Sequence, residues 1–297
     1  MTHTTQDMQG VLRRELAGTL GLLADAEDFA AMRRYRSFTF DDHDSYLRQV
    51  ERLLSTRDRL GRRTTLALFD PEEYAHFCVE TGLEPDTPTS RAAFTAELGA
   101  TGPALPYDGR PLGELVDDLL DEAMRQATWE YATTLLSLSG SCAACGEDLG
   151  RAAHDRAAAL LTRVLTVSGP GTHHLVCSVL SDTGTLVAAL HADVPPGSAP
   201  ADVDPGEALE FLTVLAVGLA RAAPGGLVAR TTNASGRDRI HGWRLRESVL
   251  LPLTAAEVFD AYCTDAETGD LVSPESGVDY AVAPDLGPQE GPHGHRF

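Results

Sequence analysis

The sequence predicts an α+β protein whose first half is rich in helix and whose second half is rich in strand. Residues 112–138 carry apolar side chains at spacings of three and four, which indicates one long amphipathic helix. Residues 173–180 and 186–194 are strand-like, and a turn sequence at 181–184 joins them as a hairpin. The helical pattern therefore precedes the strand pattern along the chain.

The N-terminal region is predicted to be mostly helical over residues 6–58, because leucines recur there at helical spacing. A strand is expected at 64–69. Asp70 and Pro71 then begin a helix, since an N-cap followed by proline at the first helical position is favourable. Residues 99–111 are rich in Gly and Pro and mark the predicted domain boundary.

The long helix is predicted to end at Gly140, before a short loop with two cysteines. The other expected elements are helices at 148–165, 207–222 and 255–263, and strands at 227–232 and 243–253. The predicted regions are a helical and βα region at 1–105, an α+β domain with the CxxC loop at 106–283, and a disordered tail at 284–297.

The composition excludes several classes of function. The net charge is −20, and all 24 basic residues are arginine. Without lysine there is no Walker A phosphate site, no Schiff base to pyridoxal phosphate and no lysine general base. Isoleucine and asparagine are also scarce, so a GC-rich bacterial genome explains the bias. Since no basic segment offsets the acidity, general binding to nucleic acid or anionic membranes is not expected.

The cysteines and the N-terminus indicate a cytoplasmic protein. No positively charged start followed by an apolar stretch predicts a signal peptide, and no apolar run approaches the roughly 20 residues that span a bilayer. The five cysteines are an odd number in a long chain. This fits a reducing compartment with reduced or metal-bound thiols better than a disulfide framework.

A metal site is predicted where Cys142 and Cys145 form a CxxCG motif. This is the form of a zinc knuckle, in which two thiolates share one ion and the glycine permits a tight turn. Two more ligands are needed, and we expect His174 and Cys177 to supply them, with His173 as a substitute. The alternatives are a redox-active CxxC pair and buried thiols without a metal.

An arginine-rich segment lies at residues 230–246 of this acidic chain. Its expected binding residues are Arg237, Arg239, Arg244 and Arg246, with Trp243 as a stacking surface. Arginine binds carboxylate or phosphate in two-point contacts, so an anionic ligand or acidic partner segment is predicted. The alternative is that these arginines neutralise carboxylates of the same chain.

Two further patterns are weaker. The run Asp41-Asp42-His43-Asp44 resembles a hard-metal or acid–base cluster, but capping of a helix start is the expected role. An RDR–strand–helix pattern ending at Cys78 recurs in a segment ending at Cys263, which indicates either an internal repeat or a coincidence of two βα units.

Together these observations predict a cytoplasmic, non-enzymatic binding or regulatory protein with a structural zinc ion and another protein as partner. One alternative is an enzyme that acts on an anionic or thiol-containing small molecule. Its cleft would be lined by His173, His174, His191 and the arginines of the 237–246 surface. Another alternative is an assembly subunit that oligomerises through the helix of residues 112–138.

Overall fold

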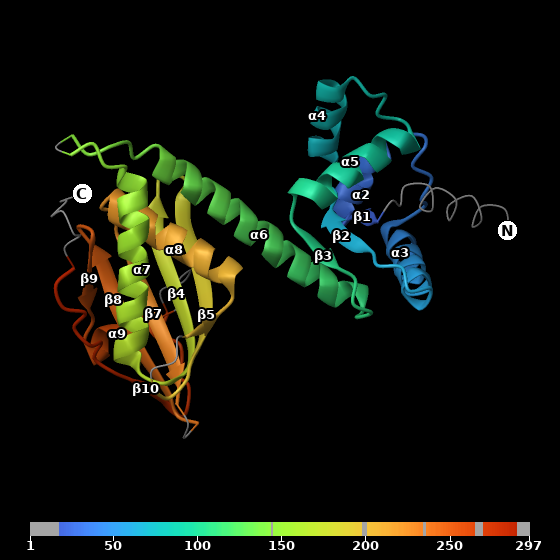
Figure 1. Ribbon diagram of the computed structural model, residues 1–297. Helices are drawn as coiled ribbons and strands as arrows, with labels where there is room; N and C mark the ends of the chain where they lie inside the picture. Colours follow the sequence, from blue (N-terminus) through green and yellow to red (C-terminus); the bar gives the residue numbers. More distant parts are fainter. Residues whose placement is uncertain (1–17, 144, 198–200, 234–235, 265–269, 290–297) are drawn as a thin grey trace. The chain divides into compact units, whose positions relative to one another are not determined.

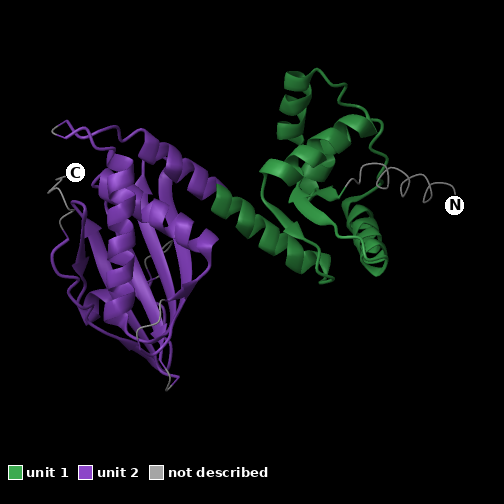
Figure 2. Cartoon of the chain, viewed as in Figure 1, with its two compact units in different colours: residues 1–126 green, residues 127–297 purple. Residues whose placement is uncertain are grey.

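The computed structural model describes residues 18–143, 145–197, 201–233, 236–264 and 270–289, and it confirms the α+β class. The chain divides into two compact units, residues 1–126 and 127–297 (Figure 2). The first unit is rich in helix, and the second contains the larger sheet (Figure 1). Within the described residues, no helix is long and apolar enough to cross a membrane.

The first unit is built around a three-stranded sheet in the order β1-β2-β3. Strand β1 (Thr19–Leu22) pairs in parallel with β2 (Thr65–Leu68), and β2 pairs antiparallel with β3 (Ala104–Pro106). Its helices are α2 (Ala26–Met32), α3 (His43–Arg59), α4 (Pro71–Thr81) and α5 (Pro88–Thr101). The predicted strand at 64–69 and the helix that begins at Pro71 are thereby confirmed.

Residues 6–58 were predicted to be mostly helical, and β1 is an exception to that prediction. Leu20 and Leu22 are buried, whereas Thr19 and Gly21 are partly exposed. This alternation of every second residue is the period of a strand. Gly21 is required there, because a Cβ atom at this position would lie 2.7 Å from Cδ2 of Phe69. Residues 6–17 of that prediction lie outside the described residues.

The second unit contains a mostly antiparallel sheet in the order β10-β8-β7-β4-β5-β6, with β9 paired to β8. Its strands are β4 (Gly171–Ser181), β5 (Gly184–Val194), β6 (Asp202–Val203), β7 (Gly225–Thr232), β8 (Asp238–Arg246), β9 (Val249–Pro252) and β10 (Val278–Tyr280). Its helices are α7 (Leu149–Ser168), α8 (Pro205–Ala220) and α9 (Ala255–Tyr262). The predicted hairpin is confirmed, since Ser181 pairs with Gly184 across a two-residue turn.

Helices α7 and α8 cover one face of this sheet, here called the inner face (Figure 1). Leu175, Cys177 and Val179 of β4 point into this core, while the residues between them do not. Helix α8 lies close to the sheet through Gly218, where a Cβ atom would be 2.4 Å from Leu245 and 2.9 Å from Val179. The inner face is therefore tightly packed.

The end of the chain differs from the prediction in two places. The expected strand at 243–253 is a hairpin, because Glu247 and Ser248 adopt φ of 50° and 61° and reverse the chain between β8 and β9. Residues 284–289 of the predicted disordered tail are packed against the core. Trp243 Nε1 donates to Pro284 O at 3.0 Å, and Leu286 is buried.

Helix α6 (Leu112–Ser137) contributes to both cores. Leu115 and Leu119 are buried in the first unit, and Ala132 and Leu135 are buried in the second. The units divide within this helix, so the predicted boundary at 105/106 lies too early in the chain. Between the two ends, Met124 leaves 70% of its surface exposed, although it belongs to the predicted apolar stripe.

We predict that Gly218→Ala destabilises the second unit by about 1–2 kcal/mol. Overpacking of a core costs about 1–3 kcal/mol, and the better helix propensity of alanine offsets part of that cost. The measurement is urea unfolding followed by fluorescence of the buried Trp243. Gly113→Ala in α6 is the control, since nothing lies within 4 Å of its added Cβ atom, and it should not destabilise the protein. Equal stability of the two variants would contradict the packing.

Candidate functional site

The described residues of the CxxCG motif lie in a small exposed hairpin between α6 and α7, here called the thiol hairpin (residues 141–143 and 145–148). Ser141 and Asp148 form an antiparallel bridge, and Cys142 N donates to Glu147 O at 2.8 Å. Gly146 has a φ of 75°, and its N–H donates to Cys142 O at 2.8 Å. The predicted need for glycine in a tight turn is met. Cys145 is exposed, Cys142 is partly exposed, and neither forms a disulfide.

The four-ligand set predicted from the sequence is wrong in its second half. His174 and Cys177 are three residues apart on β4, so they point to opposite faces of the sheet. Cys177 is completely buried on the inner face, where burial raises the pKa of its thiol to about 12. The described residues contain no group of three or more His, Cys, Asp or Glu side chains that could hold a metal ion. A zinc ion held by Cys142 and Cys145 remains a prediction.

His173 is a structural histidine in the core of the second unit. Its Nε2 lies 2.9 Å from Gly169 O and its Nδ1 lies 2.9 Å from Thr231 Oγ1. Only the tautomer protonated at Nε2 satisfies both contacts, since a carbonyl oxygen can only accept. Burial lowers the pKa of His173, so the ring is neutral near pH 7. This residue therefore lines no cleft, which corrects its placement in the enzymatic alternative.

The predicted anionic-ligand patch is not supported. Trp243 is completely buried and offers no stacking surface, because its side chain packs on the inner face. Three of the four arginines are paired within the chain: Arg239 with Asp279, Arg244 with Glu257 and Arg246 with Glu247. These arginines neutralise local carboxylates, as the alternative reading held. Arg237 is exposed, and no salt bridge of its side chain is found in the described part of the chain.

A histidine–glutamate cluster lies at one end of the face opposite α7 and α8, here called the outer face. His174 of β4 pairs across the strands with His191 of β5, and their rings stack with centroids 4.7 Å apart. Glu207, in the first turn of α8, accepts from the backbone N–H of His191 at 2.8 Å and lies 3.2 Å from its Nδ1. Partial burial, His191 and Arg230 lower the pKa of His174, against the opposing effect of Glu207.

This cluster can move protons. A carboxylate that holds Nδ1–H leaves Nε2 of the same imidazole as a base, and His174 supplies a second, neutral imidazole. Glu207 was missed in the sequence analysis because its position beside β5 follows only from the packing of α8 on the sheet. His191 was placed in the enzymatic alternative, and the structure brings it together with His174.

A groove of about 740 Å³ adjoins the cluster. Thr172 and Asp193 line it, and each lies two residues from a cluster histidine on the same face of its strand. Thr172 Oγ1 donates to Asp193 Oδ1 at 2.7 Å. The other lining residues are Pro170, Gly171, Val194, Pro195, Pro196, Asp202, Thr232 and Asn233. The surface of the groove is mostly apolar. Its charged lining residues, Asp193 and Asp202, are acidic, and none of the lining residues is basic.

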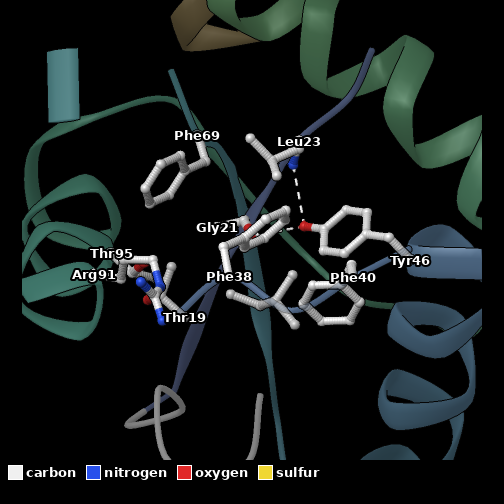
Figure 3. A pocket seen from close by; sticks show the side chains of 10 residues that line it. Thr19, Gly21, Leu23, Phe38, Phe40, Tyr46, Phe69, Arg91 and Thr95 are labelled. Atoms are coloured by element: carbon white, nitrogen blue, oxygen red, sulfur yellow. Dashed lines mark hydrogen bonds between the residues drawn. The ribbon is translucent and has the colours of Figure 1, made fainter. Parts of the chain in front are cut away.

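The first unit contains a much smaller cavity, shown in Figure 3. Aromatic rings and the buried side chain of Arg91, which is 3% exposed, surround a volume of about 30 Å³. This volume has room for one or two water molecules. Tyr46 accepts from Leu23 N at 3.2 Å and donates to Gly21 O at 3.3 Å (Figure 3). Arg91 Nη1 donates to Ser37 Oγ at 2.8 Å. At this size the cavity is a feature of the core and is too small for a metabolite.

Carboxylates gather where the parallel strands β1 and β2 end. Asp25 caps α2 and Asp70 caps α4, each by accepting backbone N–H groups. Asp28 lies between them, and burial followed by repulsion from Asp25, Asp70 and nearby glutamates raises its pKa to about 6. The sequence analysis predicted only the capping role of Asp70, and the parallel pairing of β1 and β2 brings the other acids near it. Repulsion between these carboxylates therefore lowers the stability of the first unit when Asp28 is ionised.

The two weaker sequence patterns are resolved by the structure. Asp42 is the N-cap of α3 and accepts from Ser45 N at 2.8 Å, as expected for capping. The strand–helix parts of the repeat recur, as β2 followed by α4 and β9 followed by α9. The RDR triplets do not correspond, because residues 57–59 end helix α3 whereas 238–239 begin strand β8, so the full pattern is a coincidence.

Comparison with known proteins adds one match. A family described as "Domain of unknown function (DUF8829)" matches residues 7–110. The match covers most of the first unit and none of the second unit. No curated protein and no solved structure is similar to the chain.

We predict that Asp28→Asn stabilises the first unit at pH 7.5 by about 1 kcal/mol, a value reduced from the full pKa shift because the group is partly exposed. A folded-state pKa above the unfolded-state value means that stability is lost as the pH rises through about 6. The gain should therefore be clearly smaller at pH 4.5 and vanish only below the unfolded-state pKa of 3.8. The measurement is chemical unfolding at both pH values, with exposed Glu97→Gln as control. An equal gain at both pH values would contradict the electrostatic origin.

Proposed function

We propose that this chain is a cytoplasmic, non-enzymatic binding or regulatory protein that binds another protein through the outer face of β4, β5 and β7. One observation carries the proposal. The solvated face of an antiparallel sheet is normally polar, but here apolar side chains surround a single serine, Ser178. The residues of this apolar face are Val176, Leu180, Val187, Ala189 and Val228.

The register supports the contiguity of the apolar face. Ala189 lies beside Val176 across β5 and β4, and Val228 lies on the other side of Val176 in β7. Cross-strand neighbours of this kind have Cβ atoms about 5 Å apart. Leu180 and Val187 leave 53% and 51% of their surfaces exposed. Within the described residues of the second unit, α9 packs on β8 and leaves these side chains uncovered.

The surroundings of the apolar face suit a protein partner. His174 and His191 border it at one end, and Arg230 lies in the same cross-strand row. Arg230 is neutralised by Asp238 and by Glu275 at 2.9 Å, so the border is polar without excess positive charge. An apolar centre with a polar rim is the usual anatomy of protein interfaces. A nucleic acid would instead require unpaired basic residues.

A second candidate function is acid–base catalysis at His174, His191 and Glu207. The imidazole–carboxylate contact and the adjoining groove favour it. The acidic groups in the groove favour a neutral or cationic small molecule over the anionic substrate first considered. This candidate has no nucleophile assigned to it and ranks below the binding function.

The binding function is tested by Val187→Glu. A photo-crosslinking residue at position 187 first captures the partner, which is then purified, and its affinity is measured by calorimetry. We expect Val187→Glu to weaken the affinity at least tenfold, about 1.4 kcal/mol, because a charge would be buried in the interface. Thr162→Glu on the exposed side of α7 is the matched control and should bind normally. A partner that binds both variants equally would contradict the proposal.

The catalytic candidate is tested with panels of chromogenic ester and amide substrates. Turnover should be lost in His191→Asn and Glu207→Gln and retained in Thr185→Ala, a substitution on the same strand outside the cluster. Activity that survives His191→Asn, or no turnover by the unaltered protein, would remove this candidate.

A further inference from the structure

The thiol hairpin provides half of a metal site. Its two cysteines lie three residues apart, and backbone hydrogen bonds from Cys142 N to Glu147 O and from Gly146 N to Cys142 O shape the hairpin. The N–H of Leu149 also donates to Gly140 O at 3.0 Å, which closes the base of the hairpin. In Figure 1 the loop between α6 and α7 extends beyond the ends of both helices. Both cysteines thus lie at least partly exposed in one short hairpin.

The remaining cysteines of the same chain do not complete this site. Cys78 is buried in the first unit, Cys177 lies under α7 and α8, and Cys263 is buried at the end of α9. The nearest carboxylates are engaged elsewhere: Glu147 accepts from Arg151 Nη2 at 3.2 Å, and Asp148 caps α7. Structural zinc has four ligands in tetrahedral geometry. Since the described residues group no third His, Cys, Asp or Glu with these two cysteines, they offer two thiolates to an ion that takes four.

We propose that the thiol hairpins of two copies of this chain bind one Zn²⁺ ion jointly, through Cys142 and Cys145 of each copy. A twofold axis through the ion supplies the two missing thiolates from an identical surface, which is the usual symmetry of a homodimer. Zinc displaces the protons of the four thiols and forms four Zn–S bonds, with no change in oxidation state. The site is incomplete without the second copy.

Two features next to the hairpin favour this arrangement. The N-terminus of α7, capped by Asp148, lies at the base of the hairpin and fixes its end of the turn to a helix. Leu138 stands beside the hairpin with 72% of its surface exposed, and a second copy at the tip would cover it. The contact is confined to the tip, so two chains of charge −20 meet over a small area.

The test uses the full chain purified in reducing buffer without chelator. Light scattering gives its mass, and elemental analysis gives its zinc content. We expect a dimer with one zinc ion per two chains, which becomes a monomer with a strong chelator and a dimer again with added Zn²⁺. The double variant Cys142→Ser, Cys145→Ser should be a zinc-free monomer with unchanged circular dichroism. Ser141→Ala, in the same hairpin, is the control and should keep both the zinc and the dimer.

Three outcomes would overturn the proposal. A monomer that retains one zinc ion per chain would mean that the site is completed within the chain. A dimer that dissociates with reductant but not with chelator would be a disulfide dimer. A chain that takes up no zinc when Zn²⁺ is added has no site at the hairpin. The Val187→Glu variant keeps the hairpin intact, so failure of the outer-face proposal leaves this result unaffected.

Discussion

The alternation of side chains along the strands of the second unit governs the chemistry of this protein. Two helices bury one face of the sheet, so every odd residue from His173 to Val179 enters the core. His174 is exposed by the same rule and meets His191, while Cys177 is removed from any site on the surface. Which polar residues can act together is thus set by strand register and not by their closeness in sequence.

The absence of lysine shapes the surface in a related way. Every salt bridge of the described residues that involves a permanently charged base uses arginine, whose planar fork suits paired contacts with carboxylates. In a chain of charge −20, each arginine has many acids from which to find a partner. The segment at 230–246 therefore balances local acids, and a local excess of arginine in the sequence was a poor guide to a binding patch.

The predictable parts of the fold were those with a strong local signal. The helix of residues 112–138, the helix begun by Asp70 and Pro71, and the β4–β5 hairpin rest on periodicity, capping and turn residues. Strand β1 was missed because Leu20 also continues the helical spacing of Leu12, Leu16 and Leu23, and a strand of four residues is too short to show its own period clearly. The histidine–glutamate cluster, the carboxylates around Asp28 and the packed segment at 284–289 depend on contacts between distant residues, which no local pattern contains.

Helix α6 illustrates how one sequence pattern can serve two cores. Its apolar stripe is continuous in sequence, and continuity suggested a single buried face. The structure uses the stripe in two pieces, with Leu119 in one core, Leu135 in the other and Met124 exposed between them. An apolar stripe therefore specifies a helix more reliably than it specifies what covers that helix. The same reasoning applies to the outer face of the sheet and to Leu138, where apolar side chains that the second unit itself leaves uncovered are the strongest indication of partners outside the chain.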